Sequence, residues 1–427
     1  MSHERPKGAV DHGHWAGLEY HHQLLEDPFR TDAYERAIRA LVRPGMRVLD
    51  LGCGTGVLSL LAARQGAIVH AVESTPIIRV AQALARANGL DAQIRFHQAD
   101  AETMEPVEPV DLVISDFMGR FVVDDGMLAA ARNAGRWLAP GGRFAPSKIR
   151  MFLAPAACKL RPWEVFSTGF CGLDLSAALP LLANSGWAAA LTPEGLLGDA
   201  SLYATLDPPH RIGPFEGDLR FVLKRGRLQA LAGWFEADLA PGITLHTGPG
   251  HETHWGQYLF PVPVFDVDDG DTLDVAVRFD EPTSEWRWAG TLTTRGAKHA
   301  FSYTSEPEIE TRTLPAPAPA PRGREASLAH HEAALAKHAT GDRRAAADLW
   351  EAAVRALRPE DDDLAPLLFE HLGTVRLALG EDGAAARAFL RALDGTRSSR
   401  EAAAKHLPVA FERAGYPIAA AKRFPRG

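Results

Sequence analysis

The stretch Val48-Leu49-Asp50-Leu51-Gly52-Cys53-Gly54-Thr55-Gly56 decides the fold of this chain. An apolar run ends in three glycines, and helical spacing begins at Val57, which predicts a strand, a tight turn and a helix. Gly52, Gly54 and Gly56 let the backbone approach a ligand, and the start of the helix directs free N–H groups toward it. The stretch therefore predicts a nucleotide-type site in an α/β domain.

Two acids refine this interpretation. Glu73 follows a second predicted strand, Val69-His70-Ala71-Val72, and an acid in that position accepts hydrogen bonds from both hydroxyls of a ribose. Asp50 stands just before the turn, where it can meet the amino group of a bound amino acid. A dinucleotide-binding turn is the alternative, but its pattern is G-x-G-x-x-G instead of G-x-G-x-G. The combination is similar to the S-adenosylmethionine (SAM) site of class I methyltransferases.

Composition limits the classes of function. The chain has 427 residues, enough for two or three domains, and a net charge of -8 that gives no general attraction to nucleic acid. Cys53, Cys158 and Cys171 have no metal-ligand spacing and indicate a reducing compartment. No targeting segment or membrane-length apolar run is evident. We expect a cytoplasmic protein without a metal site, a membrane partner or a nucleic-acid partner.

The segment before the first strand resembles that of protein arginine methyltransferases. The positions in register are His21, Leu24, Leu25, Asp27, Arg30 and Thr31. The resemblance implies that Arg30 binds the SAM carboxylate, a bidentate task that suits a guanidinium, and that Leu24 contributes to the acceptor pocket. Asp11 and Trp15 stand where the family has paired aromatics, so the cover over the cofactor is expected to differ.

Asp100-Ala101-Glu102 follows the third predicted strand. In class I methyltransferases an acid in this place accepts from the adenine amino group, while a neighbouring backbone N–H, here that of Ala101, meets the ring. Glu102 matches the arginine methyltransferase register and Asp100 matches the wider class, so both remain candidates.

Asp116-Phe117-Met118-Gly119 ends the fourth predicted strand, and Asp125 stands nine positions after Asp116. The family has Ser-Glu-Trp-Met-Gly here, with a second Glu nine residues after the first. The resemblance implies that the two acids hold a guanidinium, a permanent planar cation, with Met118 lining the same pocket. An Asp withdraws each carboxylate by roughly 1.5 Å. The loop must therefore lie further inward, or the pocket holds a different acceptor.

The segment His251 to Tyr258 provides the second strong match, because the family has Thr-His-Trp at this place. The resemblance implies that His254 pairs with Asp27 and that Trp255 walls the substrate pocket, where a flat ring fits a flat guanidinium. Whether His254 also acts as a general base stays open.

The chain divides into five expected segments. They are a flexible N-terminus 1–17, a SAM-binding Rossmann-like domain 18–146, a β-barrel-like substrate domain 147–312, a Pro/Ala linker 313–325 and a helical domain 326–427. In the family, the region at about 163–208 holds a helical arm that makes a homodimer. An insertion packed on its own domain is the alternative.

The C-terminal region contains an internal echo. Gly341, Ala346, Trp350 and Ala353 recur 39 positions later as Gly380, Ala385, Phe389 and Ala392. These positions are similar to those of tetratricopeptide repeats and predict a groove for a peptide or partner helix, with helices 399–422 as a cap. A plain helical bundle is the alternative.

The favoured hypothesis is a SAM-dependent methyltransferase, similar to protein arginine methyltransferases, that modifies a protein or peptide arginine. One alternative is methylation of a non-arginine or small-molecule acceptor. The other is a catalytically weak SAM-binding scaffold that works through its repeat domain.

Overall fold

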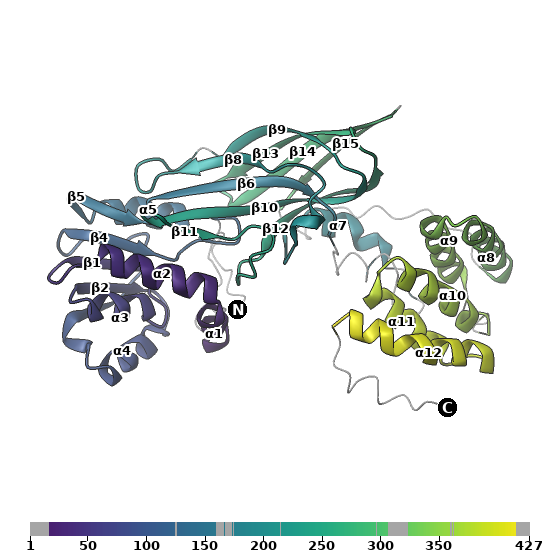
Figure 1. Ribbon diagram of the computed structural model, residues 1–427, viewed down its shortest axis with the longest axis horizontal. Coiled ribbons are helices and arrows are strands. Elements are labelled where there is room, and N and C mark those ends of the chain that lie inside the picture. The colour runs from purple at the N-terminus through teal and green to yellow at the C-terminus, as the bar shows by residue number, and fades with distance from the viewer. Residues whose placement is uncertain are drawn as a thin grey trace, which may run out of the picture. The chain divides into compact units, whose positions relative to one another are not determined.

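The computed structural model describes residues 17–123, 126–158, 166, 173, 175–213, 215–295, 297–305, 323–358, 361 and 363–415. The chain forms two compact units (Figure 1). The first comprises Met1–Cys158 with Ala183–Glu306, and the second comprises Lys159–Leu182 with Pro307–Gly427. The expected flexible N-terminus, apart from residue 17, and the expected linker, apart from residues 323–325, lie outside the described residues.

A parallel five-stranded sheet in the order β3-β2-β1-β4-β5 forms the centre of the nucleotide-binding domain. Its strands are β1 Arg47–Leu51, β2 Ile68–Glu73, β3 Ile94–Gln98, β4 Val110–Ser115 and β5 Leu138–Ala145. Leu49 of β1 lies between His70 and Val113 of its two neighbours. The strand order reverses between β1 and β4, and open sheets of this kind bind ligands beyond the carboxyl ends at such a point.

Helices and one short 3-10 turn accompany this sheet. They are α1 Leu18–Glu26, α2 Pro28–Leu41, α3 Val57–Arg64, α4 Ile78–Ala87, η1 Asp91–Gln93 and α5 Met127–Gly135. Asp27 caps α2, because its side chain accepts from the backbone N–H of Arg30 at 3.0 Å, and Pro28 supplies the first helical residue. No described helix is both long and apolar enough to cross a bilayer.

Two antiparallel sheets form the β-rich domain expected from residue 147 onward. One sheet has the order β7-β12-β10-β6-β8, with β11 paired to β10, and the other has the order β15-β14-β13-β9. The strands are β6 Lys148–Ala156, β7 Trp187–Ala189, β8 Ser201–Leu206, β9 Glu216–Val222, β10 Gly226–Ala240, β11 Ile243–His246, β12 Gln257–Val267, β13 Thr272–Asp280, β14 Glu285–Thr294 and β15 Ala297–Thr304. A single hydrophobic core joins these sheets to the nucleotide-binding domain.

The helical arm predicted for about 163–208 does not extend that far. Within that range the described helical segments are η2 Ser176–Ala178, α7 Leu179–Ala183 and the short turn η3 Pro193–Gly195. From Trp187 the chain enters the sheet, where β7 pairs with β12 and β8 pairs with β6. Strand pairing overrides the Leu/Ala-rich composition here, because Tyr203 and Leu206 complete the buried core. Most of residues 163–174 lie outside the described part.

The described residues of the second unit from 323 onward form five consecutive helices. They are α8 Arg324–Ala339, α9 Arg343–Ala356, α10 Ala365–Ala378, α11 Asp382–Ala392 and α12 Arg397–Arg413. Helix α8 begins inside the expected linker, and α12 ends before the predicted limit of 422.

The 39-residue echo corresponds to two helical hairpins with equivalent cores. Gly341 and Gly380 both have positive φ, +82 and +74, in the turns between paired helices. The remaining echo positions are all buried: Ala346 and Ala385, Trp350 and Phe389, Ala353 and Ala392. In the second hairpin Gly373 allows close packing, because a Cβ there would lie 2.8 Å from the Phe389 ring. The echo therefore reflects repeated packing.

Histidines surround the buried Trp350. Its indole N–H donates to Nδ1 of His331 at 3.0 Å, and the ring of His371 stacks on it nearly parallel at 5.2 Å between centroids. Burial, followed by the nearby His371, lowers the pKa of His331. Burial, followed by His338, lowers the pKa of His371. Both shifts favour the neutral form, and Nδ1 of His331 must be unprotonated to accept the hydrogen bond from the indole N–H.

Acid should loosen this helical unit. A histidine with a lowered folded pKa contributes stability above its unfolded value of about 6.5, and that contribution is lost as the pH falls below it. We expect hydrogen-exchange protection of α9 and α10 to fall between about pH 7.5 and about pH 5.5, and to fall less in His331→Asn, whose amide oxygen still accepts from Trp350. His330→Asn, on the same helix, is the control. Equal pH dependence in all three proteins would contradict the assignment.

Candidate functional site

A cavity of about 350 Å³ lies at the carboxyl ends of the parallel strands. Nine predicted site residues line it, namely Leu24, Arg30, Gly52, Gly54, Glu73, Ala101, Glu102, Asp116 and Met118. Five others do not line it, namely Asp27, Asp50, Gly56, His254 and Trp255. Asp125 lies outside the described residues. The carboxyl ends of the strands thus gather most of the predicted site in one place.

The glycine turn allows an unusually close approach of helix α1. Gly52, Gly54 and Gly56 all have positive φ, which L side chains rarely adopt. A Cβ on Gly54 would lie 2.5 Å from the ring of His21, which is buried on α1. Tyr20, His21, Leu24 and Leu25 of this helix line the cavity. Tyr20 was not predicted as a site residue, although helical spacing places residues 20, 21 and 24 on one face of a helix.

Glu73 is fixed at the end of β2 by two backbone groups. One carboxylate oxygen accepts from the N–H of Gly54 at 3.1 Å, and the other accepts from the N–H of Thr75 at 2.8 Å. Each oxygen retains a further lone pair. The carboxylate can therefore still accept from ribose hydroxyls in the cavity that it lines.

Asp50 is buried in strand β1. Its carboxylate is 1 % exposed and accepts from the hydroxyl of Ser59 at 2.6 Å, beneath the turn. Burial raises its pKa to about 6 against the opposing effect of Ser59. Asp50 thus fastens β1 to α3 and is not among the residues that line the cavity, and its contact with a cofactor amino group stays a prediction.

The loop after β3 presents both candidate acids to the cavity. Asp100 accepts from the backbone N–H of Glu102 at 2.8 Å, which uses one of its oxygens inside the loop. The carboxylate of Glu102 packs against Gly126, where a Cβ would meet it. Asp100 therefore stabilises the conformation of the loop, and the side chain of Glu102 contacts Gly126 outside it.

Arg30 and Asp116 form a buried ion pair. Nε of Arg30 donates to Oδ2 of Asp116 at 2.5 Å, and Nη2 lies 2.5 Å from the same oxygen. Nη1 donates to the carbonyl of Leu24 at 3.2 Å. Burial opposes the charge on Arg30, but Asp116 outweighs it and raises the pKa of the guanidinium. Oδ1 of Asp116 is buried and has no hydrogen-bond partner in the described structure. The sequence analysis missed this pair, which joins the predicted cofactor-binding cation to the predicted acceptor-binding anion.

Asp27 connects helix α2 to the loop that carries His254. One oxygen caps α2, and the other accepts from the backbone N–H and Nδ1 of His254 at 2.8 and 2.9 Å. Burial would raise the pKa of Asp27, but the bonds from His254 and Arg30 outweigh it and hold that pKa below its usual value. The pairing implied by the family resemblance is present, next to the cavity and not in its lining.

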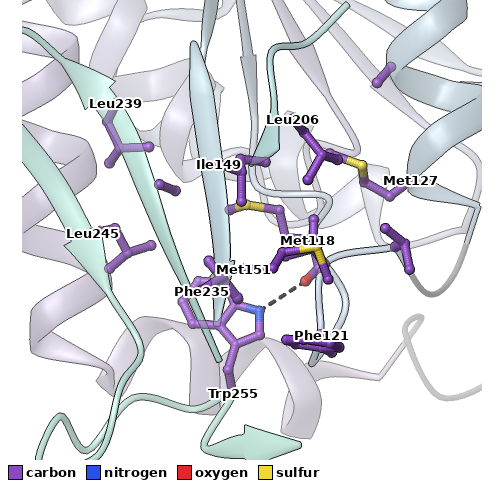
Figure 2. Close-up of a cluster of buried hydrophobic side chains, with 14 of the residues drawn as sticks. Met118, Phe121, Met127, Ile149, Met151, Leu206, Phe235, Leu239, Leu245 and Trp255 are labelled. Carbon is purple, nitrogen blue, oxygen red and sulfur yellow. Dashed lines mark hydrogen bonds between the residues drawn. The ribbon is translucent and has the colours of Figure 1, made fainter. Parts of the chain in front are cut away.

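Trp255 lies in the core, as Figure 2 shows, and not on the cavity wall. Its indole N–H donates to the carbonyl of Met118 at 2.9 Å, and its ring packs edge-to-face on Phe235 at 5.4 Å. The role of Trp255 as a stacking surface for a guanidinium therefore stays a prediction. A buried indole needs a partner for its N–H, and the carbonyl of Met118 supplies one. Trp255 thus supports the segment after β4 that contains Met118.

Comparison with known proteins agrees with this geometry. A family model described as a methyltransferase domain matches residues 48–142. Protein arginine N-methyltransferase 6 of Xenopus laevis is 31% identical over 268 residues, which are 57% of this chain and 78% of that protein. Protein arginine N-methyltransferase PRMT10 of Oryza sativa subsp. japonica is 31% identical over 305 residues, 61% of this chain and 80% of that protein. The chain belongs to the protein arginine N-methyltransferase family.

Solved structures of the family have the same fold. The crystal structure of Arabidopsis thaliana protein arginine methyltransferase 10 is 26% identical, with a TM-score of 0.58 over 69% of this chain and 99% of that chain. The Trypanosoma brucei PRMT1 enzyme-prozyme complex with AdoHcy gives a TM-score of 0.61 at 21% identity, over 68% of this chain and 99% of that chain.

The residues of the cavity fit SAM, which is the cofactor of this methyltransferase. The cavity volume of about 350 Å³ lies in the range of small-molecule sites. The glycine turn, the carboxylate of Glu73 and the guanidinium of Arg30 all line that cavity, and their backbone N–H, acceptor and cationic groups are chemically suited to the parts of SAM. No group of three or more His, Cys, Asp or Glu side chains among the described residues is arranged to hold a metal ion.

Gly54→Ala should impair cofactor binding. A methyl group there must displace His21 from the turn and also strain a backbone with φ of +53. We expect affinity for S-adenosylhomocysteine, measured by calorimetry, to fall more than about tenfold, equivalent to about 1.4 kcal/mol. The matched control is Gly89→Ala, where φ is +69 and no atom lies within 4 Å of the new Cβ. It carries similar strain of about 1 kcal/mol. Equal losses in the two variants would show that strain alone is responsible.

Proposed function

We propose that this protein transfers the methyl group of SAM to a guanidinium nitrogen of an arginine in a protein or peptide. The observation that carries the proposal is the state of Asp116. One of its oxygens holds Arg30, while the other is buried, unpartnered and part of a residue that lines the cofactor cavity. A buried unpaired carboxylate oxygen is costly, and an N–H of a guanidinium would satisfy it.

Each end of the cofactor has a partner in this proposal. The backbone of the glycine turn approaches the centre, Glu73 accepts from the ribose, and Ala101 with Glu102 meets the adenine. Asp100 is the alternative to Glu102 at the adenine, because both acids line the cavity. Arg30 takes the carboxylate, and it must share its guanidinium with Asp116 or release that residue to do so.

Electrostatic placement accounts for the methyl-transfer step. When bound, SAM supplies an electrophilic methyl group on a sulfonium. Asp116, with Asp125 as its proposed partner, orients the guanidinium and holds its positive charge on one side, so that a terminal nitrogen faces the methyl group. His254 keeps Asp27 and the start of α2 in place, and Met118 and Leu24 border the acceptor.

The length of Asp116 supports a second candidate, methylation of a different or smaller acceptor. The carboxylate is drawn onto Arg30 instead of extending across the cavity. Mass spectrometry of a lysate incubated with labelled SAM and the enzyme separates the two, because labelled products other than methyl-arginine would favour this second candidate. An absence of any labelled product would favour a scaffold.

Asp116→Asn should separate cofactor binding from catalysis. It removes the negative charge that faces the acceptor while it leaves Arg30 available to the cofactor carboxylate. We expect the rate of methyl-arginine formation to fall at least about 100-fold, with affinity for S-adenosylhomocysteine unchanged or tighter.

Asp111→Asn is the matched control for this substitution. Asp111 lies at the opposite end of the same strand, where its carboxylate accepts from the backbone N–H of Arg47 at 2.8 Å. It should retain the wild-type rate. Full activity of Asp116→Asn would remove the assignment of the acceptor site.

The proposal extends to assembly and to the second unit. We propose a cytoplasmic homodimer, a barrel-like arrangement of the two antiparallel sheets, and tetratricopeptide-like hairpins that bind a peptide or partner helix. Leu18, Leu25 and Phe29 are exposed apolar side chains on α1 and the start of α2, and we call these three residues the α1–α2 surface. Apolar surfaces of this kind often mark protein interfaces, and we assign this one to a second copy of the chain.

Phe29→Asp should weaken self-association. A carboxylate in the middle of the α1–α2 surface would lose its hydration on dimer formation and would therefore disfavour it. Analytical ultracentrifugation should show at least an approximately tenfold weaker dimer, equivalent to about 1.4 kcal/mol. Val222→Asp changes a side chain that is 63 % exposed on strand β9 and should leave association unchanged. A monomeric wild-type protein would disprove the dimer.

A further inference from the structure

Tyr34 lies where the cofactor and acceptor sites meet. It stands on α2 four residues after Arg30 and is 1 % exposed. Its hydroxyl donates to the backbone carbonyl of Ser115 at 2.8 Å. Ser115 is the last residue of β4, directly before Asp116. The hydroxyl of Tyr34 therefore anchors the backbone from which the Asp116 side chain extends.

Tyr34 also contacts the cation that holds Asp116. The guanidinium carbon of Arg30 lies 5.7 Å from the centre of the Tyr34 ring, a distance at which a cation is attracted to an aromatic face. The spacing of four residues places both side chains on one face of α2. Arg30 in turn donates a hydrogen bond from Nε to Oδ2 of Asp116 and forms an ion pair with it. Tyr34, Arg30 and Asp116 thus form a closed set of contacts.

Tyr34 remains a neutral donor within this set. Burial, followed by the charge of Asp116, raises the pKa of the phenol well above its usual value. The proton therefore stays on the hydroxyl and is available to Ser115.

An aspartate makes this anchoring more important than a glutamate would. Its shorter side chain has one rotatable bond fewer, so the position of its carboxylate follows the backbone more closely. A displacement of about 1 Å at a reacting centre can cost on the order of 100-fold in rate. Loosening the end of β4 would therefore misplace Oδ1 of Asp116.

We propose that Tyr34 is a positioning residue for methyl transfer, which fixes the end of β4 so that Asp116 keeps one oxygen for the acceptor while the other holds Arg30. This inference rests on the proposed function. It assigns Tyr34 no contact with substrate, because Tyr34 acts through Ser115, Arg30 and Asp116.

Tyr34→Phe tests the inference, because it removes the hydroxyl and retains the ring beside Arg30. We expect kcat for methyl-arginine formation to fall about tenfold, with KM for SAM within about threefold of the wild-type value. Tyr203→Phe is the matched control. Tyr203 is also buried and donates to a strand carbonyl, that of Val277 at 3.3 Å. Its variant should lose similar stability but retain kcat. An unchanged kcat in Tyr34→Phe, or an equal loss in Tyr203→Phe, would overturn the inference.

A double-mutant cycle distinguishes positioning from general destabilisation. In an Asp116→Asn background, Tyr34→Phe should change kcat by less than about twofold, because the carboxylate that it positions is gone. An undiminished effect in that background would overturn the inference. If the wild-type protein forms no methyl-arginine, the proposed function fails, and the same cycle is then measured by affinity for S-adenosylhomocysteine. Tyr34→Phe should change the affinity for S-adenosylhomocysteine about threefold when Asp116 is present and should leave it unchanged in the Asp116→Asn background. If Tyr34→Phe changed this affinity equally in both backgrounds, the role of Tyr34 would be rejected.

Discussion

The ion pair between Arg30 and Asp116 is the interaction on which the site depends. Both side chains are more than nine-tenths buried, and removing two charges from water is expensive unless further bonds compensate. The carbonyl of Leu24 accepts a further hydrogen bond from the guanidinium, and the ring of Tyr34 lies beside the same cation. The pair thus requires helix α1, helix α2 and strand β4 to meet at one point, and that point is the cofactor cavity.

Asp27 extends the same constraint to the β domain. Its two oxygens join the start of α2 to the backbone and side chain of His254. Trp255, the next residue, donates to Met118 and thereby connects the loop to the acceptor segment. Hydrogen bonds therefore connect the start of α2, the loop that carries His254 and Trp255, and the segment at Met118. The shared hydrophobic core of the two domains keeps these segments in place.

The second unit is stabilised in a different way. Its equivalent hairpins use small residues for close helix packing and a large aromatic ring for each core, Trp350 in one and Phe389 in the other. Histidines accompany both rings, since His371 stacks on Trp350 and His406 stacks on Phe389. Repetition of this local packing explains why a weak sequence echo marks two structurally equivalent hairpins.

The sequence by itself determined the features that depend on local conformation and periodicity. The glycine turn, the cap and proline at the start of α2, and the positions of the helical echo follow from backbone preferences within a few residues. Only the tertiary structure decided that Asp50 faces Ser59, that Trp255 joins the core, that residues after Trp187 enter the sheet, and that Arg30 pairs with Asp116. The last pair is separated by 86 positions, and Trp255 by 137 from Met118. Such contacts arise from competition among many possible partners for buried hydrogen bonds and core volume, which no local pattern encodes.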